Sequence, residues 1–497
     1  MYNFVICGVF KNESHILYEW INHYLIRGVD HIYLVNDFSN DEYLDIINIF
    51  SDKVTLFNND IVTNNIGRQV LIYEKYFKNL LSNTKWIGII DLDEFLYSPT
   101  NEKFNDILNK YDNYSQIQID WLHFGSNDHK IQPISVISGF TKRADFDKNK
   151  NSDFYSYKCI FKSNSLIKFD VHSMNVKGQT IHLKYNDSIV PSLVINHYNI
   201  QSYDFYINVK GKRGDINNHF DHNNLKRDTD LFNKYDKNEV IDLRLFKQNK
   251  NKISFNHILE NNEDITLIIT SCNRPSLLSK TLESFVKMNT YPIKNTYIID
   301  DSGNIGCNDN IILNYVDKLK IISIYNEKNI GQVESIDKVY SYVKTKWIFH
   351  CEEDWEFTKP NFIEKSMNVF LENPYEKIYT VWLRSHSCTS GHPIIKDNLN
   401  RGYYTMKKDF TYISKGITYI WGGITFNPGL RKTSDCLILH PYSCCCEKSK
   451  HNDEEYVGEY TINKEYLNLG YYSMILSDTD GHVKHIGWNN HIPRKWD

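Results

Sequence analysis

Residues 83–95 read NTKWIGIIDLDEF, and the rest of the chain can be interpreted outward from this stretch. Its apolar run, Trp86 to Ile90, predicts a buried strand. The run ends in alternating carboxylates, Asp91 and Asp93. Unpaired charge at the mouth of a hydrophobic strand would cost several kcal/mol of desolvation, which a hard divalent cation such as Mg²⁺ or Mn²⁺ offsets. The stretch therefore predicts a metal site, with a simple turn cap as the alternative.

The same pattern occurs a second time. Residues 345–354 read TKWIFHCEED, which aligns Glu352 with Asp91 and Asp354 with Asp93 at an offset of 261 residues. Further pairs match in the same order: 3–9 with 264–270, 35–39 with 299–302, 65–67 with 329–331, and 117–122 with 378–383. This self-similarity predicts two copies of one domain.

Chain length agrees with the repeat. A chain of 497 residues accommodates two domains of ordinary size. The stretch from about Lys247 to Asp264 is polar and poor in apolar residues, so we place the boundary there. We expect domains at 1–255 and 264–497, joined by a linker at 256–263.

Composition restricts the partners. A net charge of −4 and a pI near 6.6 give no positive electrostatic field that would attract a polyanion, so we expect no nucleic-acid partner. No apolar run approaches the ~18 residues of a transmembrane helix. Ten unevenly spaced cysteines, and a strand that follows Met1 almost at once, favour a reducing, cytoplasmic location. Alanine occurs only at Ala144 while Asn, Ile, Lys and Tyr abound, which is typical of an AT-rich genome such as that of a giant DNA virus.

Strands and helices alternate in both copies. In the first copy we expect strands at 4–9, 31–35, 54–57 and 86–90, and helices at 15–27, 41–50 and 68–81. In the second we expect strands at 265–270, 296–299, 320–324 and 347–350, and helices at 275–288, 310–319 and 331–343. This order predicts an α/β class with two tandem Rossmann-like domains and mostly parallel sheets. Ligands of such sheets bind at the carboxyl ends of strands, where Asn12, Asp37 and Asp91 fall.

Each motif has a chemical interpretation and a structural alternative. A metal held by Asp91 and Asp93 leaves coordination positions open for phosphate oxygens, as a nucleoside diphosphate leaving group requires. Asp37 and Asp301 each end a second strand, where they could accept the imino proton of uracil. The alternative for both is a turn-forming Asx residue.

Two resemblances follow from these residues. The second copy, with Thr270 to Pro275, Ile299 to Ser302, Asn329 to Gly331 and Glu352 to Asp354, resembles nucleotide-sugar glycosyltransferases of family 2 with the GT-A fold. The first copy resembles glycosyltransferase family 92. Its matching pieces are Lys11 to Glu13 with Glu19 to Ile21, Asp91 to Phe95, Trp121 with Phe124 to Ser126, and His197-Tyr198 with Ser202, Phe205 and Arg213-Gly214.

The resemblances imply transfer of a sugar from an NDP-sugar, UDP-linked, with inversion and with Mn²⁺ or Mg²⁺ as cofactor. The resemblances imply that the metal ligands are Asp91, Asp93 and His197 in the first copy, and Glu352, Asp354 and His485 in the second. Glu352 departs from the usual Asp. The implied donor-binding residues are Asn12, Glu13, Asp37, Asn65, Gly67 and Asp91, with Asn273, Arg274, Asp301, Asn329, Gly331 and Glu353 in the second copy. Each histidine could instead be an ordinary packed residue.

Inversion requires a carboxylate that deprotonates the acceptor hydroxyl. In the second copy, Glu454 or Glu455 matches the acidic position that such enzymes carry before their last helix, and we expect both residues to enter that helix. The alternative is a charge that complements the helix dipole. In the first copy, Asp128 after the Phe-Gly-Ser turn is the candidate.

The sequence thus predicts a bifunctional enzyme in which two domains each add a sugar to a glycan or glycoprotein acceptor. The alternative keeps one domain active and makes the other a glycan-binding or structural scaffold. A nucleotidyltransferase that makes the NDP-sugar is disfavoured, because the chain shows no Gly-rich N-terminal loop with a following basic residue to hold a triphosphate.

Overall fold

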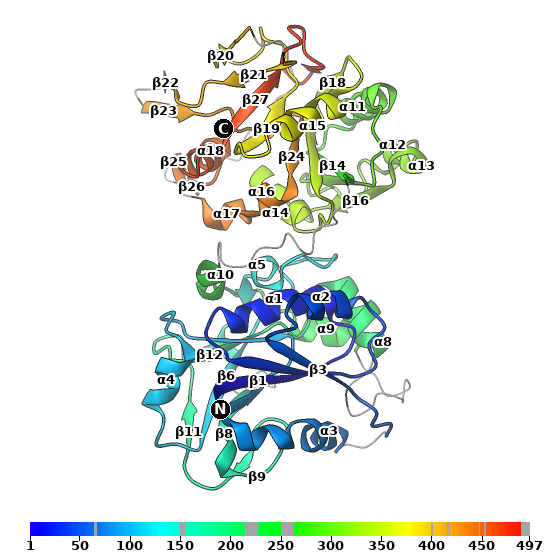
Figure 1. Ribbon diagram of the computed structural model, residues 1–497. Coiled ribbons are helices and arrows are strands. Elements are labelled where there is room, and N and C mark those ends of the chain that lie inside the picture. Colours follow the sequence, from blue (N-terminus) through cyan, green and yellow to red (C-terminus); the bar gives the residue numbers. More distant parts are fainter. Residues whose placement is uncertain are drawn as a thin grey trace. The chain divides into compact units, whose positions relative to one another are not determined.

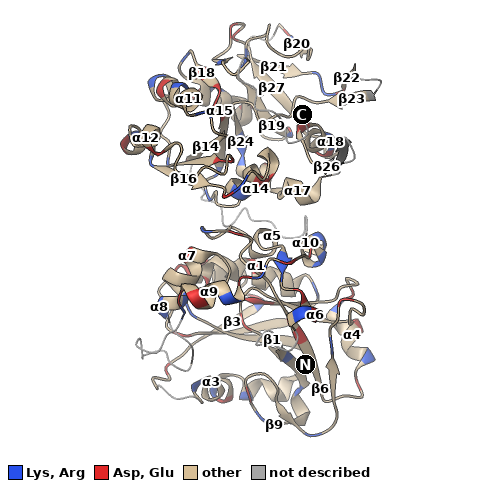
Figure 2. Cartoon of the chain, turned by 180° about the vertical axis from the view of Figure 1, so that it is seen from behind, with Lys and Arg blue, Asp and Glu red and all other residues tan. Residues whose placement is uncertain are grey.

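The computed structural model describes residues 1–497 except 64–66, 150–155, 214–215, 217–226, 250–262, 399–400, 415–416, 447, 452–453 and 489–497. The chain divides into two units, Met1–Ser254 and Phe255–Asp497, and each is described by itself (Figure 1). Basic and acidic residues are interspersed over the helices and loops of both (Figure 2). None of the described helices combines the length and apolarity that a membrane span requires.

The N-terminal unit begins with alternating strands and helices. Its strands are β1 (Tyr2–Phe10), β2 (His31–Asn36), β3 (Val54–Asn58), β4 (Thr84–Ile89), β5 (Glu94–Tyr97), β6 (Gln116–His123), β7 (Lys142–Arg143), β8 (Tyr157–Lys162), β9 (Leu166–Lys168), β10 (Asn175–Val176), β11 (Thr180–Leu183), β12 (Val194–His197) and β13 (Val240–Ile241). Its α-helices are α1 (Ser14–Leu25), α2 (Tyr43–Ile49), α3 (Arg68–Tyr76), α4 (Phe104–Lys110), α5 (Val136–Gly139), α6 (Phe146–Asn149), α7 (Tyr203–Phe205), α8 (Gly211–Arg213), α9 (Thr229–Tyr235) and α10 (Arg244–Asn249). Two 3-10 helices, Lys78–Asn83 and Ser163–Ser165, and a π-helix, Tyr206–Lys210, complete it.

The main sheet of this unit has the order β3-β2-β1-β4-β8-β6-β12-β5, with β11 beside β6. Strands β1 to β4 pair in parallel, whereas β8 is antiparallel to its neighbours and β5 to β12. In Figure 1, α1 and α2 cover one face and α3 the other. Cys7 pairs with Ile89 and Phe10 with Asn36, so the carboxyl ends of β1, β2 and β4 meet at one edge.

The C-terminal unit begins with the same alternation. Its strands are β14 (Ile265–Ser271), β15 (Asn295–Asp300), β16 (Ile321–Tyr325), β17 (Trp347–Glu352), β18 (Trp355–Phe357), β19 (Ile378–Trp382), β20 (Ile394–Ile395), β21 (Tyr403–Met406), β22 (Phe410–Ser414), β23 (Ile417–Trp421), β24 (Gly429–Lys432), β25 (Ser449–His451), β26 (Glu454–Tyr456), β27 (Tyr472–Leu476) and β28 (Val483–His485). Its helices are α11 (Pro275–Met288), α12 (Asp309–Ile312), α13 (Val316–Leu319), α14 (Gln332–Tyr340), α15 (Phe362–Glu372), α16 (Thr433–Leu437), α17 (Tyr442–Cys445) and α18 (Glu459–Asn468).

Its first sheet, β16-β15-β14-β17-β24, repeats the parallel order of β3-β2-β1-β4 and ends in the antiparallel β24. A second sheet has the order β19-β27-β21-β20. The predicted α/β class with two mostly parallel sheets is therefore confirmed. Helix boundaries differed from the predictions: α3 ends at Tyr76 and gives way to a 3-10 helix, α14 ends at Tyr340 rather than at 343, and the helix expected at 310–319 is split into α12 and α13.

Buried neutral histidines make the C-terminal unit sensitive to acid. Burial lowers the pKa of His440 to about 4, and its ring donates to the backbone oxygen of Asp337 at 2.7 Å. The unfolded chain binds this proton near pH 6.5, so stability is complete above that pH and falls as the pH drops from 6.5 toward 4. We expect a loss of about 2 kcal/mol at pH 5, at ~1.4 kcal/mol per pH unit.

Urea unfolding of wild type and His440→Gln at pH 7.5 and pH 5 measures this contribution. The variant should lose less stability between the two pH values than wild type, whatever its stability at pH 7.5. An equal loss in both proteins would contradict the assignment.

Candidate active sites

In the N-terminal unit, the two predicted carboxylates lie on the short connection from β4 to β5. Trp20 of α1 holds this connection in place, because its indole N–H contacts the backbone oxygens of Asp91 at 3.0 Å and Glu94 at 3.1 Å. Asp93 is buried, whereas the Asp91 side chain is 37% exposed. The connection thus holds the Asp93 carboxylate in the protein interior and exposes part of the Asp91 carboxylate to solvent.

Each of these carboxylates has a lysine partner from elsewhere in the chain. Lys158 of β8 donates to Asp91 Oδ2 at 2.8 Å, and Lys210 donates to Asp93 Oδ2 at 2.6 Å. Both lysines are buried. Burial would raise the pKa of Asp93, but the charges of Lys210 and His197 hold that pKa well below its ordinary value.

His197, at the end of β12, faces Asp93 as predicted. Its Nε2 lies 3.6 Å from Asp93 Oδ1, and its ring packs on Trp121 at a centroid distance of 4.3 Å. Ligand atoms of Asp93, Glu94 and His197 all lie within 4.8 Å of one another. Glu94 Oε1 is buried and has no hydrogen-bond partner among the described residues. This donor set of two carboxylates and one imidazole fits a divalent ion.

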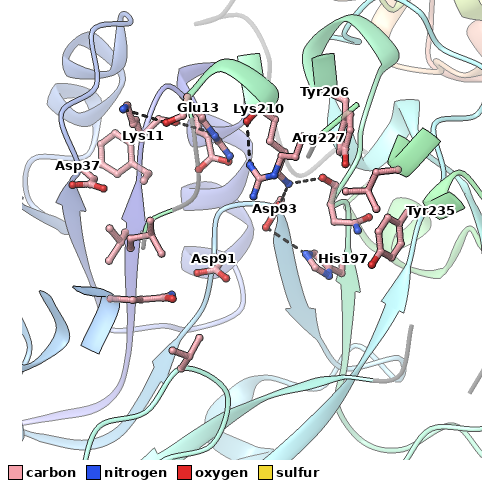
Figure 3. A pocket seen from close by; sticks show the side chains of 18 of the residues that line it. Lys11, Glu13, Asp37, Asp91, Asp93, His197, Tyr206, Lys210, Arg227 and Tyr235 are labelled. Atoms are coloured by element: carbon pink, nitrogen blue, oxygen red, sulfur yellow. Dashed lines mark hydrogen bonds and ion pairs between the residues drawn. The ribbon is translucent and has the colours of Figure 1, made fainter. Parts of the chain in front are cut away.

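A cavity of about 400 Å³ opens beside this set, within the range of small-molecule sites. Its lining includes Lys11, Glu13, Asp37, Asp91, Asp93, His197, Lys210, Arg213 and Arg227 (Figure 3). Arg213 donates to Glu13 Oε1 at 2.8 Å and to the Lys11 backbone oxygen at 2.6 Å. Lys210, Arg213 and Arg227 therefore bring three cations to this cavity.

The other predicted donor-binding residues of this unit surround the same strand ends. Asp37 lines the cavity and forms a buried, bidentate ion pair with Arg68 at the start of α3, at 2.6 and 2.8 Å. Asn12 has a left-handed backbone (φ 51°) and accepts from the Asn40 N–H at 2.9 Å. Gly67 is the N-cap of α3. Asn65 lies outside the described residues.

In the C-terminal unit, the acidic triplet Glu352 to Asp354 begins at the last residue of β17, near the position that Asp91 to Asp93 occupy after β4. Glu352 accepts hydrogen bonds from Gln332 at 2.8 Å and from the Trp355 indole at 3.1 Å. Burial, together with the charges of Asp354 and Glu459, raises the pKa of Glu352 to about 8. Its carboxyl group is therefore held by neutral donors.

Asp354 faces His485, the histidine that the sequence predicted as its fellow metal ligand. His485 of β28 places Nε2 at 3.3 Å from Asp354 Oδ2, and Arg274 donates to the same oxygen at 2.9 Å. Arg274 also donates to Glu353 at 2.8 Å. Asp354 Oδ1 is buried without a hydrogen-bond partner among the described residues. Burial would raise the pKa of Asp354, but His485 and Arg274 keep it below its ordinary value.

The other predicted donor-binding residues of this unit lie on three connections, which follow β14, β15 and β16. Asp301 accepts from the backbone N–H groups of Ile330 and Gly331, each at 2.8 Å, while Asn329 donates to the Asp301 backbone oxygen at 2.9 Å. The Asn273 N–H donates to Asp300 Oδ2 at 3.2 Å. The sequence-predicted residues of the second copy thus lie around the ends of β14, β15 and β17.

Comparison with known proteins agrees with this geometry. Residues 2–240 match the model of glycosyltransferase family 92, and residues 266–426 match that of glycosyl transferase family 2. The chain carries two glycosyltransferase domains. Both predicted family resemblances are confirmed. We call them the family 92 domain and the family 2 domain.

Curated relatives cover the family 92 domain. A glycosyltransferase family 92 protein of Ricinus communis is 24% identical over 213 residues, which are 40% of this chain and 36% of that protein. One of Oryza sativa subsp. japonica is 25% identical over 213 residues, which are 40% of this chain and 34% of that protein. The chain spans about a third of the length of these relatives.

Solved glycosyltransferase structures are more distant. S. aureus TarS is 14% identical over 43% of this chain and 35% of its own, with a TM-score of 0.30. GalNAc-T7, solved with UDP, GalNAc and Mn²⁺, is 12% identical over 47% of this chain and 45% of its own, with a TM-score of 0.33.

The candidate bases lie elsewhere than expected. Glu454 and Glu455 belong to the short strand β26, which pairs with β25, so the prediction that they enter the last helix was wrong. That helix, α18, begins at Glu459, after the N-cap Gly458. In the family 92 domain, Asp128 is exposed and is not among the residues that line the cavity. The catalytic roles of these three acids stay predictions.

Glu459 is an acid that the sequence interpretation missed. Its Oε1 accepts from the Phe426 N–H at 2.6 Å and from Thr425 Oγ1 at 2.8 Å. Its charge contributes to the raised pKa of Glu352, which places it near the acidic triplet. The glycine before it was the available signal, since Gly at an N-cap marks a helix start.

Proposed function

We propose that each domain transfers a sugar from a nucleoside diphosphate sugar, UDP-linked, to a hydroxyl of a glycan or glycoprotein, with inversion and with a divalent cation. One repeated geometry carries this proposal. In both domains a strand-end aspartate faces a histidine from a later strand, at 3.6 Å for Asp93 and His197 and at 3.3 Å for Asp354 and His485. Recurrence of the pair at equivalent strand ends is not required by packing.

The metal would be held by this chain's carboxylates and imidazoles. In the family 92 domain the ligands are Asp93, Glu94 and His197, and the predicted ligand Asp91 lines the cavity beside them. In the family 2 domain they are Asp354 and His485, with Glu352 beside them. When bound, Mn²⁺ or Mg²⁺ neutralises charge that develops on the leaving diphosphate. Carboxylate oxygens and the imidazole nitrogen of histidine are ligand types that such ions use in proteins.

Donor binding in the family 92 domain uses the cavity. Its cations, Lys11, Arg213 and Arg227, line one space with Asp93 and His197 of the metal set. Phosphate oxygens prefer such charge-assisted donors, and guanidinium groups bind them in a bidentate manner. A nucleoside diphosphate matches this mixture of a metal site and cations, and a cavity of about 400 Å³.

Acceptor activation in the family 2 domain falls to Glu459. Inversion needs a carboxylate that takes the proton from the acceptor hydroxyl as its oxygen attacks the anomeric carbon from the face opposite the diphosphate. Glu459 is half-buried, is held by two donors on one oxygen, and lies near the acidic triplet. The proton moves from the acceptor oxygen to Glu459, and the diphosphate leaves with the bonding pair.

A second candidate function makes the family 2 domain a scaffold or glycan-binding domain. The observation in its favour is Glu352, whose two oxygens already accept from Gln332 and Trp355. A carboxylate used in this way contributes to the fold rather than to a metal.

Release of nucleoside diphosphate distinguishes the two candidates. The full chain is incubated with UDP- and GDP-sugars, with Mn²⁺ or with EDTA, with and without a glycan acceptor. We expect release from two different donors, both suppressed by EDTA. Release from one donor supports the scaffold candidate, and no release together with no binding of UDP or GDP overturns the proposed function.

A further inference from the structure

The Lys210 ammonium forms an ion pair with Asp93, a carboxylate that is also a proposed metal ligand. Its Nζ lies 2.6 Å from Asp93 Oδ2 and also donates to the Asn199 backbone oxygen. The lysine is 7% exposed and lines the cavity at the end of the π-helix Tyr206–Lys210 (Figure 3). Asp93 Oδ1 faces His197. Both oxygens of this metal-ligand candidate therefore have partners from the chain itself.

A divalent ion bound to Asp93 would compete with the ammonium for that carboxylate. Carboxylate oxygens bind Mg²⁺ at ~2.1 Å. A metal on Asp93 would thus lie within a few ångströms of the lysine Nζ, where the two positive charges repel because the surroundings are buried. This repulsion favours release of Lys210, and its four flexible methylene groups allow it to move.

The cavity offers the displaced ammonium another anion. Lys210 and Arg213 are three residues apart, and both line the space in which the donor diphosphate is proposed to bind. A diphosphate carries several negative oxygens, and lysine binds phosphate as a point charge. The same lysine can therefore neutralise Asp93 in the empty site and the diphosphate in the loaded one.

We infer that Lys210 exchanges between two anions, holding Asp93 while the family 92 site is empty and binding the donor's diphosphate once a divalent cation has taken Asp93. This inference rests on the proposed function of the domain. The exchange couples the two ligands: the metal frees Lys210 for the nucleotide, and the nucleotide, by holding Lys210, favours the metal. Such coupling is reciprocal.

A purely structural ion pair is the alternative. In that case Lys210 only fastens the segment 206–213 to the sheet, and its removal loosens the cavity for every ligand. The two roles predict opposite changes in metal affinity when the Lys210 ammonium is removed. If Lys210 exchanges between anions, the protein binds metal alone more tightly and nucleotide more weakly. If Lys210 only fastens the segment, the protein binds both more weakly.

The test compares Lys210→Met with Lys212→Met in the full chain. Lys212 lies on α8 and is exposed, so it controls for loss of a nearby positive charge. Both substitutions are made in an Asp354→Asn background, which removes the metal contribution of the family 2 domain. Binding of Mn²⁺ alone is followed by electron paramagnetic resonance, and binding of UDP at saturating Mn²⁺ by calorimetry.

We expect Lys210→Met to bind Mn²⁺ at least about tenfold more tightly and UDP at least about tenfold more weakly than the background protein, since hydrogen bonds to charged groups have this magnitude. Lys212→Met should match the background in both measurements. Weaker binding of both ligands, or no change in either, overturns the exchange while leaving the proposed function intact. Absence of nucleoside diphosphate binding in the wild type, by contrast, overturns the proposed function and the exchange with it.

Discussion

Asp93→Asn is expected to abolish one sugar transfer, and Asp354→Asn the other. Each change keeps the side chain's shape but removes the negative charge that would hold the divalent ion. The ion's stabilisation of the leaving diphosphate is worth several kcal/mol. We therefore expect at least about a hundredfold lower kcat for the transfer catalysed by the altered domain. The transfer catalysed by the other domain should change less than about twofold, because each unit has its own site.

The measurement follows both transfers separately, each with its own donor and with acceptor supplied in excess. Asp52→Asn and Asp317→Asn are matched controls, since both acids are exposed and lie outside the sites. Full retention of both transfers in Asp93→Asn and in Asp354→Asn would refute the assignment of two metal-dependent sites. Loss of a transfer in only one of the two variants would favour a single active domain with a scaffold.

Glu459→Gln is expected to lower kcat of the family 2 domain by about 10²- to 10⁴-fold, the range that a general base contributes. The amide oxygen of Gln can still accept from the Phe426 N–H and Thr425, so the loop that Glu459 holds should stay in place. UDP affinity should change little, because the carboxylate acts on the acceptor. The pH profile of kcat should lose its acidic limb.

Glu454→Gln and Glu455→Gln are the controls for this prediction, because the sequence interpretation named them as bases. They should retain kcat within a fewfold. A large loss in either one, with Glu459→Gln active, would return the role to the sequence-based candidates. A parallel fall in UDP affinity in Glu459→Gln would instead indicate a structural role.

The histidine pairing shows how far the sequence could reach. His197 and His485 were predicted as metal ligands from the family resemblances, and both face the expected aspartate. Nothing in the local sequence separates them from packed histidines. The repeat supplied the missing information, since a metal ligand predicted in one copy indicates that the other copy has a counterpart.

The misplaced helix start shows where local reasoning failed. The acidic run Asp453 to Glu455 lies shortly before α18, and its charges are compatible with an N-terminal helix turn. The structure places Glu454 in a hairpin with β25 and begins the helix after Gly458. A pairing partner for a strand is a non-local fact, so acidic composition alone could not choose between Glu454 and Glu459.

Lysine partners were missed for a related reason. Lys158 and Lys210 reach the carboxylates across 67 and 117 residues of chain, and neither lies in a recognisable motif around Asp91 or Asp93. Glu94 adjoins Asp93 and was visible in the sequence, but only its burial beside His197, with an oxygen that accepts no hydrogen bond from the described residues, makes it a ligand candidate.

The sequence by itself determined the duplicated α/β plan and the carboxylates at the strand ends, because hydrophobic periodicity and residue type are local properties that survive without coordinates. Only the tertiary structure decided which cations face those carboxylates and which acid begins α18. These features depend on burial and on charges brought together from distant segments, and the energy of a buried charge is set by its neighbours in space rather than in sequence.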